Sequence, residues 1–367
     1  MKIRYSYLKQ QFKNSEDLWK KLKNFVATAD FTLGKPLKIF ERKFAKLIGT
    51  KYAIGVNSGT DAIKLSLKAL GIKAGDEVIT AANTFVATVG AINEIGAKIK
   101  FIDCNDTFCM DTTLIEKAIT KKTRAIIPVH FTGYVTNMTE VMKIAKKYKL
   151  FVIEDACQSI LGEFKKKISG SWGVTGAFSL HPLKNINVWS DGGMITTNNK
   201  KIYQKLILLR NHGLKNRDNV SILGYNSRLD TFQAVVGNWL LPKAKNIAKK
   251  RIENAKLYDD KFRNIKEIRI PQRPKNMKIV YHLYMVFAKN RDRLLEYCLQ
   301  KGIEAKIHYP IPMYRQKAVK FLGHKKGDFP ITDYHAKNII TFPCDQHLSK
   351  KEISYVIKTV KQFYKQK

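Results

Sequence analysis

Acidic side chains are scarce in this chain, and their scarcity sets its charge. Of 367 residues, 30 are Asp or Glu and 67 are Lys or Arg, which gives a formal net charge of +37. Such a balance raises the possibility of nucleic-acid binding. The basic residues are spread along the whole chain, however, and no separate basic arm, helix-turn-helix, RRM or zinc-finger pattern occurs. A lysine-rich composition is therefore favoured over a nucleic-acid partner, and part of the charge can attract an anionic small substrate.

Long apolar runs and paired cysteines are also missing. No run approaches the ~18 apolar residues of a membrane span, and the N-terminal MKIRYSYLKQQFKNSEDLWKK holds no apolar stretch long enough for a signal peptide. The cysteines are irregularly spaced without a CxxC pair, which disfavours a zinc ribbon or a thioredoxin-type site, and we expect no metal. We expect a reduced, cytoplasmic protein with no membrane partner. The five cysteines are Cys104, Cys109, Cys157, Cys298 and Cys344.

Short apolar runs alternate with helix-like segments through the first two thirds of the chain. The 44% hydrophobic content excludes a mainly disordered chain, and the length suits roughly two domains at ~150 residues each. Residues 52–56 predict a strand, and the GTDAIKLSLKALG segment after them predicts a helix. Repeated β-α-β predicts a mostly parallel sheet covered on both faces. Further strands are predicted at 77–80, 97–103, 124–129, 150–154, 175–180 and 192–197.

The pattern changes near residue 240. A helical stretch at 227–264 is followed by the proline-bearing RIPQRPKN, and then by strands at 280–288 and 303–308 and helices at 290–301 and 349–364. This order predicts a smaller α+β domain. We expect an N-terminal segment and a large α/β domain in residues 1–245, and a small C-terminal domain in residues 246–367.

Two segments of the predicted sheet suit an anionic ligand with a cationic group. The Asn57-Ser58-Gly59-Thr60 segment lies between a strand and a helix, where free N–H groups suit a phosphate, although a plain helix cap has the same signature. Asp155 stands at the carboxyl end of an apolar strand with Gln158 nearby. Open α/β sheets bind ligands at that edge, although Asp is also a common helix cap.

Two further residues complete a pattern. Lys184 follows an apolar strand in a loop that contains Pro182, so it is a candidate Schiff-base former if its pKa falls from about 10.4; otherwise it is a surface lysine. Phe85 follows the strand at 77–80 and suits either stacking on a flat ring or core packing. A phosphate cradle, an acid, a lysine and an aromatic plate are what pyridoxal 5'-phosphate (PLP) requires.

The linked motifs resemble the DegT/DnrJ/EryC1/StrS family of PLP-dependent sugar aminotransferases over nearly the whole chain. The resemblance implies a type I PLP-dependent aminotransferase fold, with a large, mostly parallel, seven-stranded sheet domain and a smaller C-terminal α+β domain. The segments that carry it are FERKFAKLIGTKYAIGVNSGTDAIKLSLKALGIKAGDEVI, TFVATVGAINEIGAKIKFID, IIPVHFTGYVTNM, VIEDACQS, GAFSLHPLKNINVWSDGGMITTN, LRNHG, GYNSRLDTFQA and IHYPIP.

The resemblance implies a role for each matching residue. Lys184 would bind PLP covalently and carry the proton, Asp155 would pair with the ring nitrogen, and Gln158 would contact the ring hydroxyl. Phe85 would stack on the ring, and the site would be completed in a homodimer by Asn226 of the partner subunit. The phosphate would be held by Ser58, Gly59, Thr60 and Ser179, and the substrate side by Arg228, His308 and Tyr309.

The implied reaction moves an amino group, with L-glutamate as the expected donor, to a nucleotide-linked keto-deoxy sugar. A 3-keto sugar is weakly favoured over a 4-keto sugar, and the product would serve surface polysaccharide such as lipopolysaccharide, or a glycosylated metabolite. A sugar dehydratase on the same fold is an alternative, which Lys184 disfavours because that branch carries histidine there. A basic DNA-binding or regulatory protein is another. The sequence departs from the family at Tyr314, where histidine is frequent, and at Cys157, where a small residue is usual and where we expect core packing.

Overall fold

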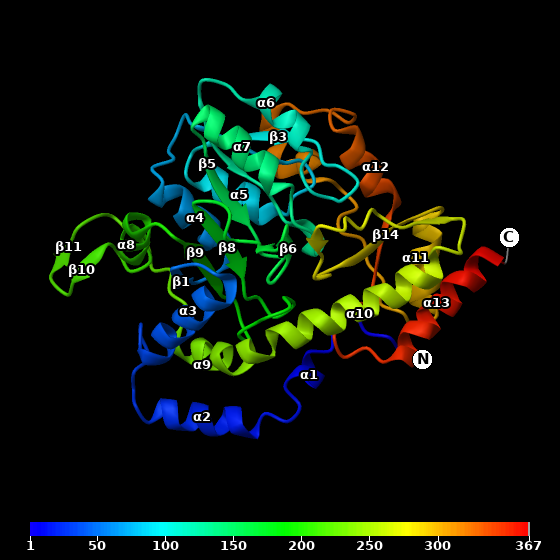
Figure 1. Cartoon of the computed structure of the whole chain (residues 1–367), viewed down its shortest axis with the longest axis horizontal. Coiled ribbons are helices and arrows are strands. Elements are labelled where there is room, and N and C mark those ends of the chain that lie inside the picture. Colours follow the sequence, from blue (N-terminus) through cyan, green and yellow to red (C-terminus); the bar gives the residue numbers. More distant parts are fainter. Residues whose placement is uncertain (366–367) are drawn as a thin grey trace.

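A computed structural model describes residues 1–365 of the chain, with a twisted seven-stranded sheet at its centre (Figure 1). Its strands are β1 (Tyr52–Val56), β2 (Glu77–Ala81), β3 (Lys98–Ile102), β4 (Thr123–Ile127), β5 (Phe151–Asp155), β8 (Thr175–Ser179) and β9 (Gly193–Thr197). Their order across the sheet is β1-β9-β8-β5-β4-β2-β3. Only β9 runs against its neighbours β1 and β8, and the other adjacent pairs are parallel. The predicted mostly parallel sheet is therefore confirmed.

Helices cover both faces of this sheet. Successive strand residues point to opposite faces, so Ile153 packs in one buried cluster and its neighbour Val152 in another. The first face is covered by α4 (Gly59–Ala69), α5 (Val86–Glu94) and α8 (Lys200–Leu209). The second is covered by α3 (Lys35–Ile48), α6 (Ile115–Ala118), α7 (Met138–Tyr148) and α9 (Thr231–Leu240), and α2 (Glu16–Val26) packs against α9 (Figure 1).

A second, smaller sheet lies beside the first. It has the order β12-β14-β15, and α11 (Arg291–Gln300), α12 (Pro330–Asn338) and α13 (Lys350–Lys365) accompany it. These strands are antiparallel, as expected for an α+β unit. The strand bounds are β12 (Ile268–Arg269), β14 (Tyr284–Ala288) and β15 (Ile339–Phe342).

One long helix, α10 (Ala244–Phe262), joins the two sheets' cores and runs from α9 to α13 (Figure 1). Near its start, Ile247 packs in a buried cluster on the large sheet. Near its end, Tyr258 and Phe262 pack in the core of the small sheet. Because one helix belongs to both cores, the division of the chain at residue 245 stays a prediction.

Two expectations for the C-terminal part are wrong in detail. The helical stretch at 227–264 is interrupted at residues 241–243, where Pro242 in a short 3₁₀ turn separates α9 from α10. The expected strand at 303–308 does not form, because Ile303 and Lys306 make only isolated bridges. This segment is instead an irregular connection beside β15 of the small sheet, and Lys306 and His308 at its end line the cavity described below.

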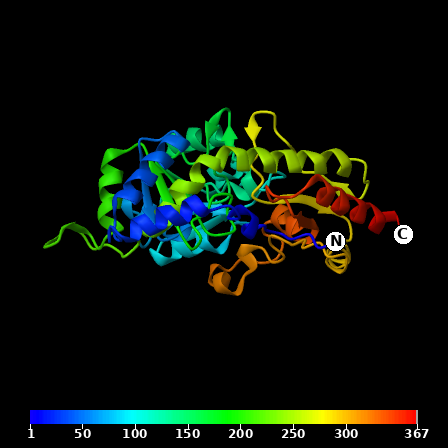
Figure 2. The same ribbon diagram turned by 90° about the horizontal axis from the view of Figure 1, so that it is seen from below.

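Two small accessory sheets lie outside these layers. One comprises β6 (Glu163–Phe164), β7 (Lys167–Ile168) and β13 (Met277–Lys278). The other is the hairpin of β10 (Leu214–Asn216) and β11 (Asn219–Val220), whose green ribbon projects from the body in Figure 2. No helix within residues 1–365 is long and apolar enough to span a membrane.

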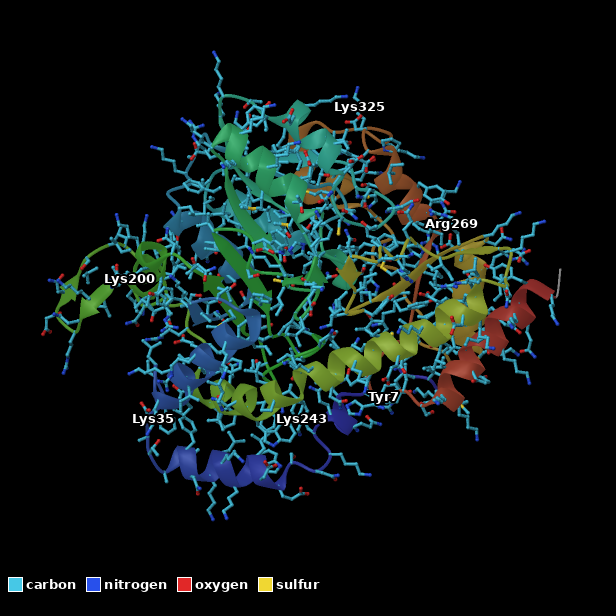
Figure 3. All side chains as sticks on the ribbon, in the orientation of Figure 1. Tyr7, Lys35, Lys200, Lys243, Arg269 and Lys325 are labelled. Atoms are coloured by element: carbon cyan, nitrogen blue, oxygen red, sulfur yellow. The ribbon has the colours of Figure 1, made fainter. Side chains whose placement is uncertain are left out.

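Basic side chains are dispersed over the molecule. The labelled Lys35, Lys200, Lys243 and Lys325 lie on widely separated parts of the fold (Figure 3). The wide separation of these four lysines agrees with the dispersion of basic residues along the sequence, and it gives no reason to single out one face for nucleic acid.

Candidate active site

A cavity of about 350 Å³ opens where the carboxyl ends of β5 and β8 meet the first turns of α4 and α5. Segments that are far apart in sequence meet there, including residues 306–309 from the small-sheet side. Most of the residues predicted for the site line this one cavity: Ser58, Gly59, Thr60, Phe85, Asp155, Gln158, Ser179, Lys184, His308 and Tyr309.

The start of α4 lines one end of the cavity, where its free backbone N–H groups suit an anion. Ser58 caps the helix, because its Oγ accepts the N–H of Asp61 at 3.1 Å. The amides of Gly59 and Thr60 follow in the first turn, where a helix offers no internal acceptor. A Cβ on Gly59 would lie 2.8 Å from the Ser179 Cβ, so only glycine allows this close approach. The cap and the anion site therefore coexist at one helix start.

Asp155 stands at the end of β5, and both its side chain and its backbone are hydrogen-bonded. Its Oδ2 accepts the hydroxyl of Thr88 at 2.7 Å, and its Oδ1 accepts the N–H of Cys157 at 3.2 Å. Its own amide donates to the carbonyl of Pro128, and its carbonyl accepts the N–H of His130, each at 3.0 Å. The side chain is only 6% exposed. A carboxylate fixed in this way is an acceptor suited to a cationic N–H.

Behind Asp155, on the other face of the sheet, lies a buried pair that fixes the same strand end. Glu154 and His130 are fully buried, with Glu154 Oε2 2.9 Å from His130 Nε2. Glu154 also accepts the backbone N–H groups of Gly170, Trp172 and Gly173 at 2.6–2.8 Å. These contacts give the buried carboxylate its hydrogen-bond donors and fix the position of the loop at residues 170–173 beside β5.

Lys184 lies in the loop after β8 with its side chain in the cavity. Burial lowers the pKa of its ammonium from the usual 10.5, an effect that Cys157 and Asp155 partly oppose. Burial likewise raises the pKa of the Cys157 thiol. Lowering the lysine pKa increases the share of neutral amine, which is the nucleophilic form. Cys157 lines the cavity, so the expectation that it serves only core packing is wrong.

Gln158 and Phe85 offer two further contacts. Gln158 Oε1 accepts the N–H of Thr132 at 2.8 Å, so its amide nitrogen is left as a donor. Phe85 is 46% exposed although it lines the cavity, and its ring lies 5.6 Å from that of Tyr309. An exposed ring at the cavity favours stacking on a ligand over the alternative of core packing.

The opposite wall comes from the small-sheet side. His308 Nδ1 lies 2.9 Å from Thr341 Oγ1, and burial, with smaller effects of Lys306 and Lys184, lowers the pKa of His308 to about 4. Burial raises the pKa of the Tyr309 phenol to about 12. A neutral imidazole and a neutral phenol can both donate and accept hydrogen bonds, which suits hydroxyl-bearing substrates.

Sequence reasoning missed several residues of the cavity. Tyr5, His282 and Lys306 lie outside the quoted motifs, so no local signal marked them, whereas His181 and Asp191 lie inside one motif but were given no role. Burial lowers the pKa of His282 well below 6.5, and its Nδ1 finds no hydrogen-bond partner among residues 1–365. The others on the cavity wall are Tyr5, His181, Asp191 and Lys306.

Two predicted residues lie outside the cavity of this chain. Asn226 forms an isolated bridge with Asn211, and Arg228 Nη1 donates to Asn211 Oδ1 at 3.1 Å. They follow the projecting β10–β11 hairpin. Their expected roles depend on a second copy of the chain and stay predictions.

The residues present fit PLP. The start of α4 and Ser179 match its phosphate, Asp155 its ring nitrogen, Gln158 its phenolic oxygen and Lys184 its aldehyde. The Phe85 ring lines the cavity and is 46% exposed, so one of its faces is available to a flat ring. The fold and the cavity together define a type I PLP-dependent enzyme.

Comparison with known proteins agrees with this class. Residues 13–361 match the model of the DegT/DnrJ/EryC1/StrS aminotransferase family, and the chain belongs to that family. It is therefore a PLP-dependent aminotransferase, and solved structures similar to it include forms with PLP and with its amino form PMP.

Three similar proteins place the chain within the family. A "pleiotropic regulatory protein" of Geobacillus stearothermophilus is 35% identical, with 95% of each chain covered. A UDP-N-acetyl-3-dehydro-alpha-D-glucosamine 3-aminotransferase of Acidithiobacillus ferrooxidans is 35% identical, covering 91% of this chain and 90% of that protein. The crystal structure of Streptomyces venezuelae DesV superposes with a TM-score of 0.96 at 30% identity, covering 99% of this chain and 98% of that one.

Proposed function

We propose that this enzyme transfers an amino group from an amino acid to a nucleotide-linked keto-deoxy sugar. The observation that carries the proposal is the meeting of Lys184 and Asp155 in one cavity that also holds an anion-binding helix start. The naming of a similar protein for 3-amination of a UDP-sugar supports the substrate class.

In this proposal PLP supplies an electron sink that labilises a Cα–H bond of the amino donor. Lys184 would hold the cofactor and, as a neutral amine, would move the proton at the donor's Cα. Asp155 keeps the ring nitrogen protonated, and Gln158 donates to the phenolic oxygen. Phe85 covers one face of the ring and excludes water from it. The phosphate is held by Ser58, Gly59, Thr60 and Ser179.

The substrate side is assigned to the small-sheet wall. His308 and Tyr309 line the same cavity as Lys184, and their neutral forms suit sugar hydroxyls, which supports this assignment. L-glutamate is the proposed donor, and a 3-keto sugar is favoured over a 4-keto sugar. The basic character of the chain would attract the diphosphate.

A homodimer is part of the proposal. Asn226 of the partner subunit would reach the phosphate, and Arg228 would help to hold an anionic substrate group. Their position after a projecting hairpin supports this arrangement. The proposed setting is the cytoplasm, which the five free cysteines support, and the proposed product serves a surface polysaccharide or a glycosylated metabolite.

The test is an absorbance spectrum of the purified protein before and after addition of L-glutamate. We expect the band of lysine-bound PLP to convert to that of PMP, after which nucleotide keto-sugars can be screened for reversal. A band that L-glutamate leaves unchanged would contradict the donor assignment. Reversal by a 4-keto but not a 3-keto sugar would contradict the favoured carbon. Salt-sensitive DNA binding without any cofactor band would instead support a regulatory role.

A further inference from the structure

A chain of two hydroxyl groups ends on Asp155. Thr84 Oγ1 lies 2.8 Å from Thr88 Oγ1, and Thr88 Oγ1 donates to Asp155 Oδ2 at 2.7 Å. Thr84 is 2% exposed and Thr88 is fully buried. Neither threonine belongs to the set of residues that sequence or resemblance assigned to the cofactor.

The number of hydroxyl protons fixes which group donates in each of these two hydrogen bonds. An ionised carboxylate only accepts hydrogen bonds, so the single hydroxyl proton of Thr88 is committed to Asp155. The Thr88 oxygen is then an acceptor for Thr84, and Thr84 must donate to it. Both O–H dipoles therefore point toward the carboxylate. The N–H of Cys157 holds its other oxygen, so each carboxylate oxygen has one donor from the protein.

Helix α5 links the hydrogen bonds of Thr84 and Thr88 to Phe85, the residue proposed to stack on the ring. Thr88 lies three residues after Phe85, within the first turn of the helix, where the backbone dipole also favours a nearby negative charge. One helical turn thus presents an aromatic ring to the cavity and a hydroxyl to Asp155. A shift of this turn would therefore move the Phe85 ring and the hydroxyl that holds Asp155 at the same time.

We propose that Thr88 is a positioning residue that fixes the direction of the Asp155 carboxylate toward the ring nitrogen of PLP, with the Thr84 hydroxyl holding Thr88 in turn. The inference rests on the proposed pairing of Asp155 with that nitrogen. Loss of the Thr88 hydroxyl removes one of the two protein hydrogen bonds to the carboxylate, so Oδ2 is no longer held in place.

The test compares PLP with an analogue in which a C–H group replaces the ring nitrogen. Binding of each to apo-protein is titrated for the wild type, Thr88→Val and Thr88→Ser. We expect Thr88→Val to bind PLP about tenfold more weakly, the size typical of a hydrogen bond to a charged group. Its affinity for the carbon analogue should equal that of the wild type, because that analogue has no N–H for Asp155. Thr88→Ser keeps the hydroxyl and should restore PLP binding.

The matched control is Thr80→Val on the neighbouring β2. Thr80 is also fully buried, and its hydroxyl donates to the Ile127 carbonyl at 3.1 Å without contacting Asp155. The Thr80→Val variant should bind PLP in preference to the carbon analogue to the same extent as the wild type. Should Thr88→Val not fold, Thr84→Val serves in its place, with an expected loss of about threefold for PLP alone.

The possible results distinguish the role of Thr88 from the proposed pairing of Asp155 with the ring nitrogen, on which it rests. Equal binding of PLP and the analogue by the wild type would overturn the pairing of Asp155 with the ring nitrogen. A wild-type preference for PLP that Thr88→Val retains would overturn only the role of Thr88. Equal losses for both compounds would show a general packing defect and would also overturn the proposal.

Discussion

The two walls of the cavity are built in different ways. The sheet-side wall consists of strand ends and helix starts, and residues such as Asp155 and Ser58 have backbone or capping hydrogen bonds that fix them. The opposite wall comes from irregular backbone around residues 282 and 306–309. Rigid, locally encoded geometry suits a cofactor that never changes, whereas an irregular wall can differ between enzymes that take different sugars.

Replacing Lys184 tests the sheet-side wall most severely. Lys184→Ala should abolish turnover and the visible band of lysine-bound PLP, because the only amine available to the aldehyde in this wall is removed. Circular dichroism should show a retained fold, since the loop keeps its backbone hydrogen bond from Lys184 to His181. A variant that keeps full activity would overturn the mechanism.

Asp155→Asn should produce the next largest loss on the same wall. The amide keeps the shape but not the charge, so the ring nitrogen loses its anionic partner. We expect the rate constant of the half-reaction with the amino donor to fall about 10- to 100-fold, as is typical for loss of a charged hydrogen bond. Single-turnover kinetics with the amino donor provides the measurement. An unchanged rate would mean that the carboxylate has only a structural role.

His308→Gln should affect the other wall and leave the first intact. We expect the KM for the nucleotide keto-sugar to rise about tenfold, the effect of one lost hydrogen-bonding group, while PLP affinity stays the same. Thr341→Val removes the partner of His308 Nδ1 and should have a smaller effect in the same direction. A loss of PLP affinity equal to the change in KM would show that the two walls do not act separately.

The smallest expected effect concerns stability. Burial lowers the pKa of His335, outside the cavity, to about 4 from 6.5. His335 therefore binds a proton more readily in the unfolded chain than in the folded one. The free energy of unfolding decreases as pH falls from about 6.5 toward 4. Linkage gives a loss of roughly 1–2 kcal/mol by pH 5. Urea denaturation at pH 7 and pH 5 measures it, and His335→Gln should reduce the difference between the two pH values.

The same contrast explains what the sequence could predict. The strand-helix alternation follows from local patterns. Ser58 and Asp155 stand at a helix start and a strand end, and Lys184 lies in the loop after a strand, so local patterns mark all three positions. Thr88 contacts Asp155, 67 positions further along the chain, and His282 meets the other cavity residues only through the folded structure, so no spacing in the sequence marks either residue. The segment 303–308 carries apolar residues as a strand would, but its backbone makes only two isolated bridges, which local propensity does not encode.

The helix α10 has a consequence for how the molecule comes apart. Ile247 belongs to one apolar core and Tyr258 to the other, yet both lie on one uninterrupted helix. Melting either core would fray the shared helix and remove contacts from its neighbour. The two sheets should consequently lose structure in one cooperative transition, and the geometry between the cavity walls persists as long as the chain is folded.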